Sequence, residues 1–248
     1  MLYWQREGAG PEVVLVHGFL GSSRIFEPLS EYLRETFSVT TIDLPGFGES
    51  RDVPVPPSVG ELAGMVIDTV RSAGLDRCSM LGHSLGAWIA LETSLQQPSL
   101  LEKMVLYGGS PDGYCPARFE TYEASADRIR SQGVEAFAAD LAAEWFQRGR
   151  QDPMYELARE AGSNASEVAA IEHILTWNQW KTRDRLAQVD TPTLVACGDR
   201  DRSTHPDLSI EMWQKIPAAN LFIIPNAGHI AHLEYPREFN AIVAEFLR

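Results

Sequence analysis

The stretch that most constrains the fold is residues 78–91, where an apolar segment, a Gly-x-Ser-x-Gly pentapeptide and a second apolar segment follow one another. Residues 78–81 predict the end of a buried strand, and the residues from Ala87 onward predict a helix. Gly82 and Gly86 flank Ser84, and glycine lets a strand and a helix approach closely around a tight turn. The pattern therefore predicts a strand–turn–helix unit that holds the hydroxyl of Ser84 on a strained turn above a sheet.

Strand-like and helix-like segments alternate on both sides of this unit. The predicted strands are residues 2–6, 13–16, 37–43, 78–81, 103–107, 193–197 and 220–224, and the other predicted helices are residues 24–35, 59–73, 206–215 and 236–247. Ser58 and Gly74 are the expected N-cap and stop of the helix over 59–73. This alternation predicts an α/β fold in which helices flank a mostly parallel central sheet.

The strand signal disappears between Asp112 and Arg185. Helices are predicted there over residues 124–132, 134–148, 154–161 and 166–177. A long helical insertion between two strands cannot lie inside the sheet, so we expect it to cover one end of it. The predicted organisation is a core of residues 1–111 and 186–248 and a helical cap of residues 112–185.

Composition excludes several classes of partner. The chain has 248 residues, 44% of them apolar, and a formal net charge of −13, which disfavours contact with nucleic acid and with anionic membrane surfaces. No apolar run approaches the roughly 20 residues that a membrane span needs, and the first ten residues do not resemble a signal peptide. We therefore expect a soluble, cytoplasmic monomer or homodimer. The three cysteines, Cys78, Cys115 and Cys197, are scattered, and we expect them to be reduced.

Polar residues that could act on a substrate follow several of the predicted strands. In a doubly wound sheet, the loops after the strands gather at one edge. These loops supply Ser84, then Asp201, then His229, and a serine hydroxyl needs a neighbouring imidazole, which in turn needs a carboxylate to fix its tautomer. Asp199 competes with Asp201 for the role of the acid, and His232 competes with His229 for that of the base. We favour Asp201, which lies further past its strand, and His229, which follows a glycine in a loop.

The remaining histidines have other expected roles. The glycine-rich loop after the strand over 13–16 is where backbone N–H groups could bind an oxyanion, and His17 is expected to brace this loop through hydrogen bonds. His83 is expected to line the pocket, and His173 and His205 to lie on the surface or in the cap. The six histidines show no metal-ligand spacing, so we expect no metal and no cofactor.

Five segments together resemble the α/β-hydrolase family: HGFLG from His17, DLPGFGES from Asp43, GHSLG from Gly82, GDRD from Gly198 and GHIAHLEYP from Gly228. The resemblance covers nearly the whole chain. It implies an α/β-hydrolase fold with a helical cap inserted after the strand that corresponds to the family's sixth. It also implies Ser84 as nucleophile, His229 as base and Asp201 as acid, with the backbone N–H groups of Phe19 and Leu85 as the oxyanion hole.

Two branches of the family are similar to this chain. Its size and the segment 110–118 resemble small carboxylesterases such as the pimeloyl-carrier-protein methyl ester esterase. Other segments are similar to the menaquinone-pathway succinyl-hydroxycyclohexadiene carboxylate synthase, a lyase that uses the same triad. That enzyme has an arginine where this chain has Trp88, four residues past the nucleophile. The favoured function is hydrolysis of a small carboxylic ester or thioester through an acyl-enzyme, and the lyase is the alternative.

An apolar acyl pocket is expected near Ser84, lined by Trp88, His83, Tyr114, Trp145 and Trp177. The predicted cap holds nine basic and thirteen acidic residues, which gives weak support to docking of an acidic carrier protein. We therefore expect a small-molecule ester or thioester as the substrate.

Overall fold

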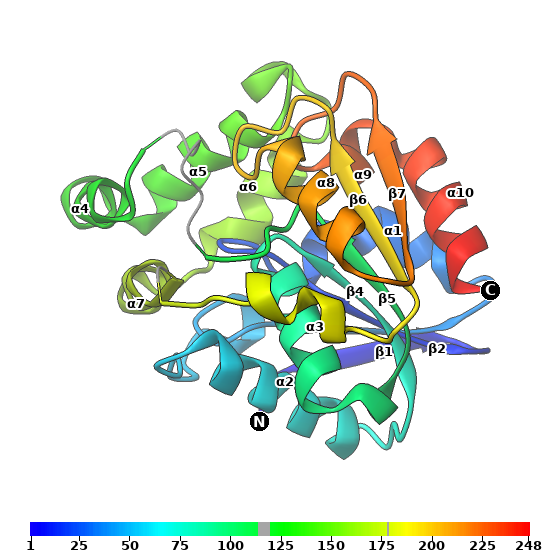
Figure 1. Ribbon diagram of the computed structural model, residues 1–248. Coiled ribbons are helices and arrows are strands. Elements are labelled where there is room, and N and C mark those ends of the chain that lie inside the picture. The colour runs from blue at the N-terminus through cyan, green and yellow to red at the C-terminus, as the bar shows by residue number, and fades with distance from the viewer. Residues whose placement is uncertain (114–119, 178) are drawn as a thin grey trace.

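Seven strands form one sheet in the computed structural model of the chain, which describes residues 1–113, 120–177 and 179–248 (Figure 1). They are β1 (Trp4–Gly8), β2 (Glu12–Val16), β3 (Ser38–Ile42), β4 (Cys78–His83), β5 (Leu101–Tyr107), β6 (Thr193–Gly198) and β7 (Ala219–Ile224). Their order across the sheet is β1-β3-β2-β4-β5-β6-β7. β1 runs antiparallel to β3, and all the other neighbours are parallel. The predicted α/β fold with a mostly parallel sheet is confirmed.

The central strands are buried because their apolar residues are continuous rather than alternating. Val13, Val14, Leu15 and Val16 of β2 are each at most 1% exposed, which is the pattern of a parallel strand covered on both faces. β7 forms an edge of the sheet and is only partly buried.

Helices outside residues 112–185 cover both faces of the sheet. They are α1 (Glu27–Leu33), α2 (Val59–Ser72), α3 (Leu85–Gln96), α8 (Pro206–Lys215), α9 (Ala231–Glu234) and α10 (Pro236–Leu247). α2 packs against α3, and α1 packs against α10 (Figure 1). Short 3-10 turns cover Ser23–Phe26, Gly48–Ser50, Pro98–Leu100, Gly149–Gln151 and Arg183–Gln188. The single helix predicted over 24–35 is therefore a 3-10 turn followed by α1, where Pro28 stands near the helix start.

The expected cap of α2 is confirmed. The Ser58 side chain accepts a hydrogen bond of 3.1 Å from the backbone N–H of Glu61, and α2 ends just before Gly74, whose φ is +79°. A glycine in this left-handed conformation is a common helix stop.

Four helices lie between β5 and β6: α4 (Tyr122–Gln132), α5 (Val134–Trp145), α6 (Tyr155–Ser163) and α7 (Glu167–Trp177). They contact the loops that follow the strands. The backbone N–H of Ser166 donates to the carbonyl of Gly46 over 2.8 Å, and His173 bonds to the carbonyl of Pro45 over 2.9 Å. The helical content predicted for this region is observed, whereas its division from the core as a cap domain stays a prediction. His173 lies in α7 of this insertion and is buried, and His205 is exposed.

The two connections of this insertion to the sheet pair with each other. The backbone N–H of Gly113 donates to Trp180 over 3.0 Å, and that of Thr182 donates to Pro111 over 3.1 Å. Asp112 also binds the guanidinium of Arg183, which reaches on to Glu211 of α8. These contacts fix where the insertion leaves and re-enters the core. No helix in the described residues combines the length and the apolar character needed to cross a membrane.

Candidate active site

Ser84 lies at the sharp turn between β4 and α3. Its backbone has φ 56° and ψ −116°, a left-handed conformation that is strained for a residue with a side chain. Two glycines make the turn possible. A Cβ on Gly82 would lie 2.0 Å from the carbonyl oxygen of Gly86, and a Cβ on Gly86 would lie 2.1 Å from that of Val16. Since these neighbours are backbone atoms, any larger residue would force the strand and the helix apart.

The loop after β2 passes directly beside this turn. A Cβ on Gly18 would lie 2.9 Å from the Cβ of Ser84, so the backbone that leads to Phe19 is in contact with the serine. Among the described residues, the backbone N–H groups of Phe19 and Leu85 have no hydrogen-bond acceptor. Leu85 is the first residue of α3, where N–H groups are free to bind an anion.

His17 braces this loop. Its Nε2 accepts a hydrogen bond of 2.9 Å from the backbone N–H of Leu44, and its Nδ1–H donates to the carbonyl of Gly18 over 2.7 Å. Burial lowers the pKa of His17, which agrees with the neutral tautomer that these two bonds require. Both ring nitrogens are occupied, so His17 has the bracing contacts expected from the sequence.

His229 and Asp201 form a buried pair behind the turn. Nδ1 of His229 lies 2.7 Å from Oδ2 of Asp201, and both side chains are at most 2% exposed. The other carboxylate oxygen accepts hydrogen bonds from the backbone N–H groups of Ser203, at 2.8 Å, and Thr204, at 3.0 Å. The carboxylate is thus fixed in orientation, and it directs the Nδ1–H of His229 toward itself.

The backbone of His229 is fixed on both sides. Its carbonyl oxygen accepts hydrogen bonds of 3.0 Å from Nε2–H of His83 and from the hydroxyl of Tyr107. Its N–H donates to the carbonyl oxygen of Trp145 over 2.9 Å. Burial raises the pKa of Tyr107 and lowers that of His83 far below its usual range, so Tyr107 stays a protonated donor and His83 stays neutral.

The competing residues lie elsewhere. Asp199 is exposed. His232 is buried, and its ring nitrogens lie 3.1 Å from the carbonyl of Ile25 and 3.2 Å from the hydroxyl of Tyr107. Burial lowers the pKa of His232 to about 4. His232 therefore braces the loop that carries His229 and has no nitrogen free for a substrate.

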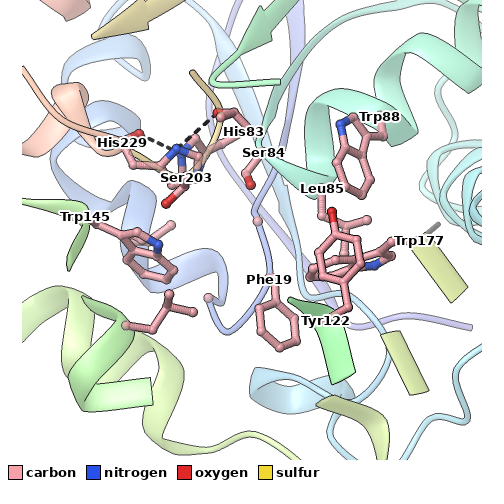
Figure 2. Close-up of a pocket in the computed structure, with 15 residues that line it drawn as sticks. Phe19, His83, Ser84, Leu85, Trp88, Tyr122, Trp145, Trp177, Ser203 and His229 are labelled. Atoms are coloured by element: carbon pink, nitrogen blue, oxygen red, sulfur yellow. Dashed lines mark hydrogen bonds between the residues drawn. The ribbon is translucent and has the colours of Figure 1, made fainter. Parts of the chain in front are cut away.

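Ser84 and His229 line one cavity, and Figure 2 shows the serine hydroxyl directed into it. Four of the five residues expected in the pocket, His83, Trp88, Trp145 and Trp177, also line this cavity, whereas Tyr114 lies outside the described residues. The lining residues are Gly18, Phe19, Gly21, Ile25, His83, Ser84, Leu85, Trp88, Tyr122, Leu141, Trp145, Trp177, Ser203, Thr204 and His229. Within the described part of the chain, no charged Lys, Arg, Asp or Glu lines it.

The aromatic side chains on one wall of this cavity pack against one another. Trp177 packs edge-to-face on Phe19 at 4.9 Å and on Trp88 at 5.6 Å between ring centroids. The indole N–H of Trp88 donates to the hydroxyl of Ser110 over 3.0 Å. Sequence reasoning did not assign Ser203 to the pocket, although Ser203 is only two residues from the favoured acid.

The described residues contain no cluster of three or more His, Cys, Asp or Glu side chains that could hold a metal ion. Cys78 and Cys197 are buried free thiols whose pKa is raised to about 12 by burial, while Cys115 lies outside the described residues. A thiol with such a pKa is a poor nucleophile at neutral pH.

The sheet order, the strained turn at Ser84 and the buried His–Asp pair beside it define a protein of the α/β-hydrolase class. The model of the Alpha/beta hydrolase family matches residues 13–242, and the chain belongs to this family. The family and fold expected from the five sequence segments are thereby confirmed.

Three comparisons show which members of the family are similar to the chain. A pimeloyl-[acyl-carrier protein] methyl ester esterase of Nitrosospira multiformis is 29% identical, over 100% of this chain and 98% of its own length. A protein of Bacillus subtilis named as a 2-succinyl-6-hydroxy-2,4-cyclohexadiene-1-carboxylate synthase is 28% identical, over 96% and 91%. The solved structure of a thermophilic esterase from Thermogutta terrifontis matches with a TM-score of 0.89 and 25% identity, over 100% of this chain and 93% of that one.

Proposed function

We propose that the protein is a cofactor-free serine hydrolase that cleaves a small, uncharged carboxylic ester or thioester through an acyl-enzyme. The observation that carries this proposal is the cavity that Ser84 and His229 share, with Asp201 buried behind the histidine at 2.7 Å. A serine beside an imidazole that is oriented by a carboxylate is the arrangement that nucleophilic acyl transfer requires. The esterases among the similar proteins support the same reaction.

The proposed first step is attack of Ser84 Oγ on the carbonyl carbon of the substrate. His229 Nε2 accepts the serine proton, and Asp201 stabilises the imidazolium that results. The negative charge on the carbonyl oxygen is stabilised by the backbone N–H groups of Phe19 and Leu85. Each such donor lowers the barrier by about 3 to 4 kcal/mol.

The proposed second step frees the alcohol or thiol. The tetrahedral intermediate collapses, the bond from carbonyl carbon to leaving group breaks, and His229 returns its proton to the leaving group. A water molecule then attacks the acyl-enzyme with His229 again as the base, which releases the acid and restores Ser84.

The lining of the cavity supports an uncharged substrate. A buried carboxylate would need a cationic or multiply hydrogen-bonded partner, and the described lining residues include no arginine or lysine. Trp88 occupies the position at which the synthase resemblance implies an arginine. For this reason we place hydrolysis of a neutral ester above the lyase reaction.

A phosphonate probe and a set of esters test the proposal. A fluorophosphonate is expected to label wild-type protein and not the Ser84→Ala variant, as read by intact mass. Chromogenic esters and thioesters of graded acyl length are expected to be turned over by wild type alone. If the protein takes up no phosphonate and cleaves no ester, but releases pyruvate from the menaquinone intermediate, the lyase is correct instead.

A further inference from the structure

Several polar side-chain groups of the cavity lining have no hydrogen-bond partner among the described residues. Nδ1 of His83 and the indole N–H of Trp177 are two of them, and both atoms are fully buried. Trp145 and Ser203 both line the cavity, yet neither the indole N–H of Trp145 nor the hydroxyl of Ser203 has a hydrogen-bond partner among the described residues. The indole N–H of Trp88, in contrast, is used by Ser110. Figure 2 shows the indole nitrogen of Trp145 turned toward Ser203, on the side of the cavity where His229 lies.

Trp145 is held firmly at this place. It is the last residue of α5, and the carbonyl groups at a helix end lack partners within the helix. Here they bind the catalytic loops: Trp145 accepts from the N–H of His229 over 2.9 Å, and Glu144 accepts from the guanidinium of Arg202 over 3.1 Å. The indole lies 6.1 Å from the imidazole of His229 between ring centroids.

Ser203 is equally fixed, because its backbone N–H donates to Asp201 over 2.8 Å. The backbone that carries each of the two polar groups therefore has a set position relative to the histidine. Because this backbone is already ordered, binding a ligand oxygen costs less conformational entropy.

The proposed reaction places the alcohol or thiol portion of the substrate on the side of the cavity where His229 lies. His229 must return its proton to the leaving oxygen or sulfur, so the alcohol or thiol portion has to lie against the histidine. The apolar wall of Trp88, Trp177 and Phe19 remains for the acyl portion.

We propose that the indole N–H of Trp145 and the hydroxyl of Ser203 bind a neutral oxygen, such as an ether, hydroxyl or carbonyl oxygen, in the alcohol or thiol portion of the substrate. The inference rests on the proposed hydrolase function and deepens it. It predicts preference for leaving groups that carry a second oxygen over purely alkyl leaving groups of the same size.

Matched esters with the same butanoyl group test this assignment. The 2-methoxyethyl ester and the n-butyl ester have equal numbers of heavy atoms and differ only in an ether oxygen that replaces a methylene. The quantity measured is the ratio of their kcat/KM values. Comparing this ratio between variants removes the difference in intrinsic reactivity of the two alcohols.

Phenylalanine keeps an aromatic ring at residue 145 but lacks the indole N–H. In Trp145→Phe the ratio is therefore expected to fall about threefold to tenfold below that of wild type, which corresponds to the loss of one neutral hydrogen bond. Ser203→Ala is a second, smaller change that is expected to lower the ratio in the same direction. Trp177→Phe is the matched control on the acyl side, for which the ratio is expected to equal that of wild type.

The outcomes separate the two proposals. Cleavage of both esters with the same ratio in wild type, Trp145→Phe and Ser203→Ala overturns the assignment of these residues and leaves the hydrolase function intact. A fall of equal size in Trp177→Phe also overturns it, because the effect would then not be specific to the side of the cavity that binds the leaving group. Absence of cleavage of either ester by wild type, together with absence of phosphonate labelling, overturns both proposals.

Discussion

The backbone N–H of His229 donates to the carbonyl oxygen of Trp145 over 2.9 Å, so the loop that carries the proposed base is bonded directly to the helical insertion. The carbonyl oxygen of His229, which belongs to the next peptide group, is bonded to the core, where His83 and Tyr107 donate to it. The base is therefore positioned jointly by the sheet and by α5. A change that moves α5 is expected to alter the chemistry at Ser84 without touching a reacting group.

The hydrogen bond between His229 and Trp145 depends on the glycine at residue 228, so a replacement of Gly228 tests its importance. A Cβ at residue 228 would lie 2.2 Å from the carbonyl oxygen of Trp145, a backbone atom that cannot move alone. We expect Gly228→Ala to displace His229 from α5 and to lower kcat about 100-fold, the usual cost of a misplacement near 1 Å. Ester turnover and the melting temperature are measured together.

The control is Gly64→Ala in α2, where a Cβ would meet nothing within 4 Å. This variant is expected to keep full activity and to gain about 0.5 to 1 kcal/mol of stability, because alanine favours the helix more than glycine does. Full activity of Gly228→Ala would show that the bond between His229 and Trp145 does not matter for the reaction.

The carboxylate of Asp201 is expected to act through the tautomer of His229. In Asp201→Asn the amide oxygen can still accept from the N–H groups of Ser203 and Thr204, which leaves the amide NH₂ facing Nδ1 of His229. Nδ1 must then be the hydrogen-bond acceptor, so Nε2 carries the ring proton. A protonated Nε2 cannot accept the proton of Ser84. We expect kcat to fall about 10⁴-fold while the fold is kept.

The readouts for Asp201→Asn are steady-state turnover and far-UV circular dichroism. Asp199→Asn is the control at the exposed neighbouring carboxylate, and its kcat is expected to stay within twofold of wild type. A larger loss in Asp199→Asn than in Asp201→Asn would reassign the acid.

Ser84 and His229 are expected to work as a unit. Each single alanine variant is predicted to lower kcat at least about a thousandfold, and the double variant is predicted to be little worse than either, since removing one partner already disables the other. Single-turnover kinetics with a chromogenic ester measure all three. Losses that multiply would mean that the two residues act in separate steps.

Much of this arrangement follows from the sequence because it depends on local rules. Uninterrupted apolar runs identify the buried strands, and the loops after β6 and β7 meet because those strands are neighbours in the sheet. This neighbourhood predicts that Asp201 and His229 meet, and their side chains lie 2.7 Å apart in the structure. The predicted boundaries of α8 and α10 agree with the structure.

The remaining features depend on contacts between segments far apart in the chain. The helix predicted over 134–148 ends at Trp145, where its carbonyl groups bind Arg202 and His229 instead of continuing the helix. Tyr122 lines the cavity because α4 packs against α7. No pattern within one segment contains this information, so only the three-dimensional structure reveals it.

Buried neutral histidines are expected to make the fold sensitive to acid. His173 donates to the carbonyl of Pro45 and stacks on Phe47, and burial lowers its pKa from 6.5 to about 4. Below pH 6.5 the unfolded chain binds a proton at this residue and the folded chain does not, so the free energy of unfolding falls as the pH drops from 6.5 toward 4. Between pH 7 and pH 5 this residue should lower the free energy of unfolding by about 2 kcal/mol.

Urea unfolding at pH 7 and pH 5 measures this change. In His173→Asn the free energy of unfolding is expected to fall by about 2 kcal/mol less than in wild type. His205→Asn, which changes an exposed histidine, is the control and is expected to lose as much as wild type. Equal losses in His173→Asn and wild type would mean that folding does not lower the pKa of His173.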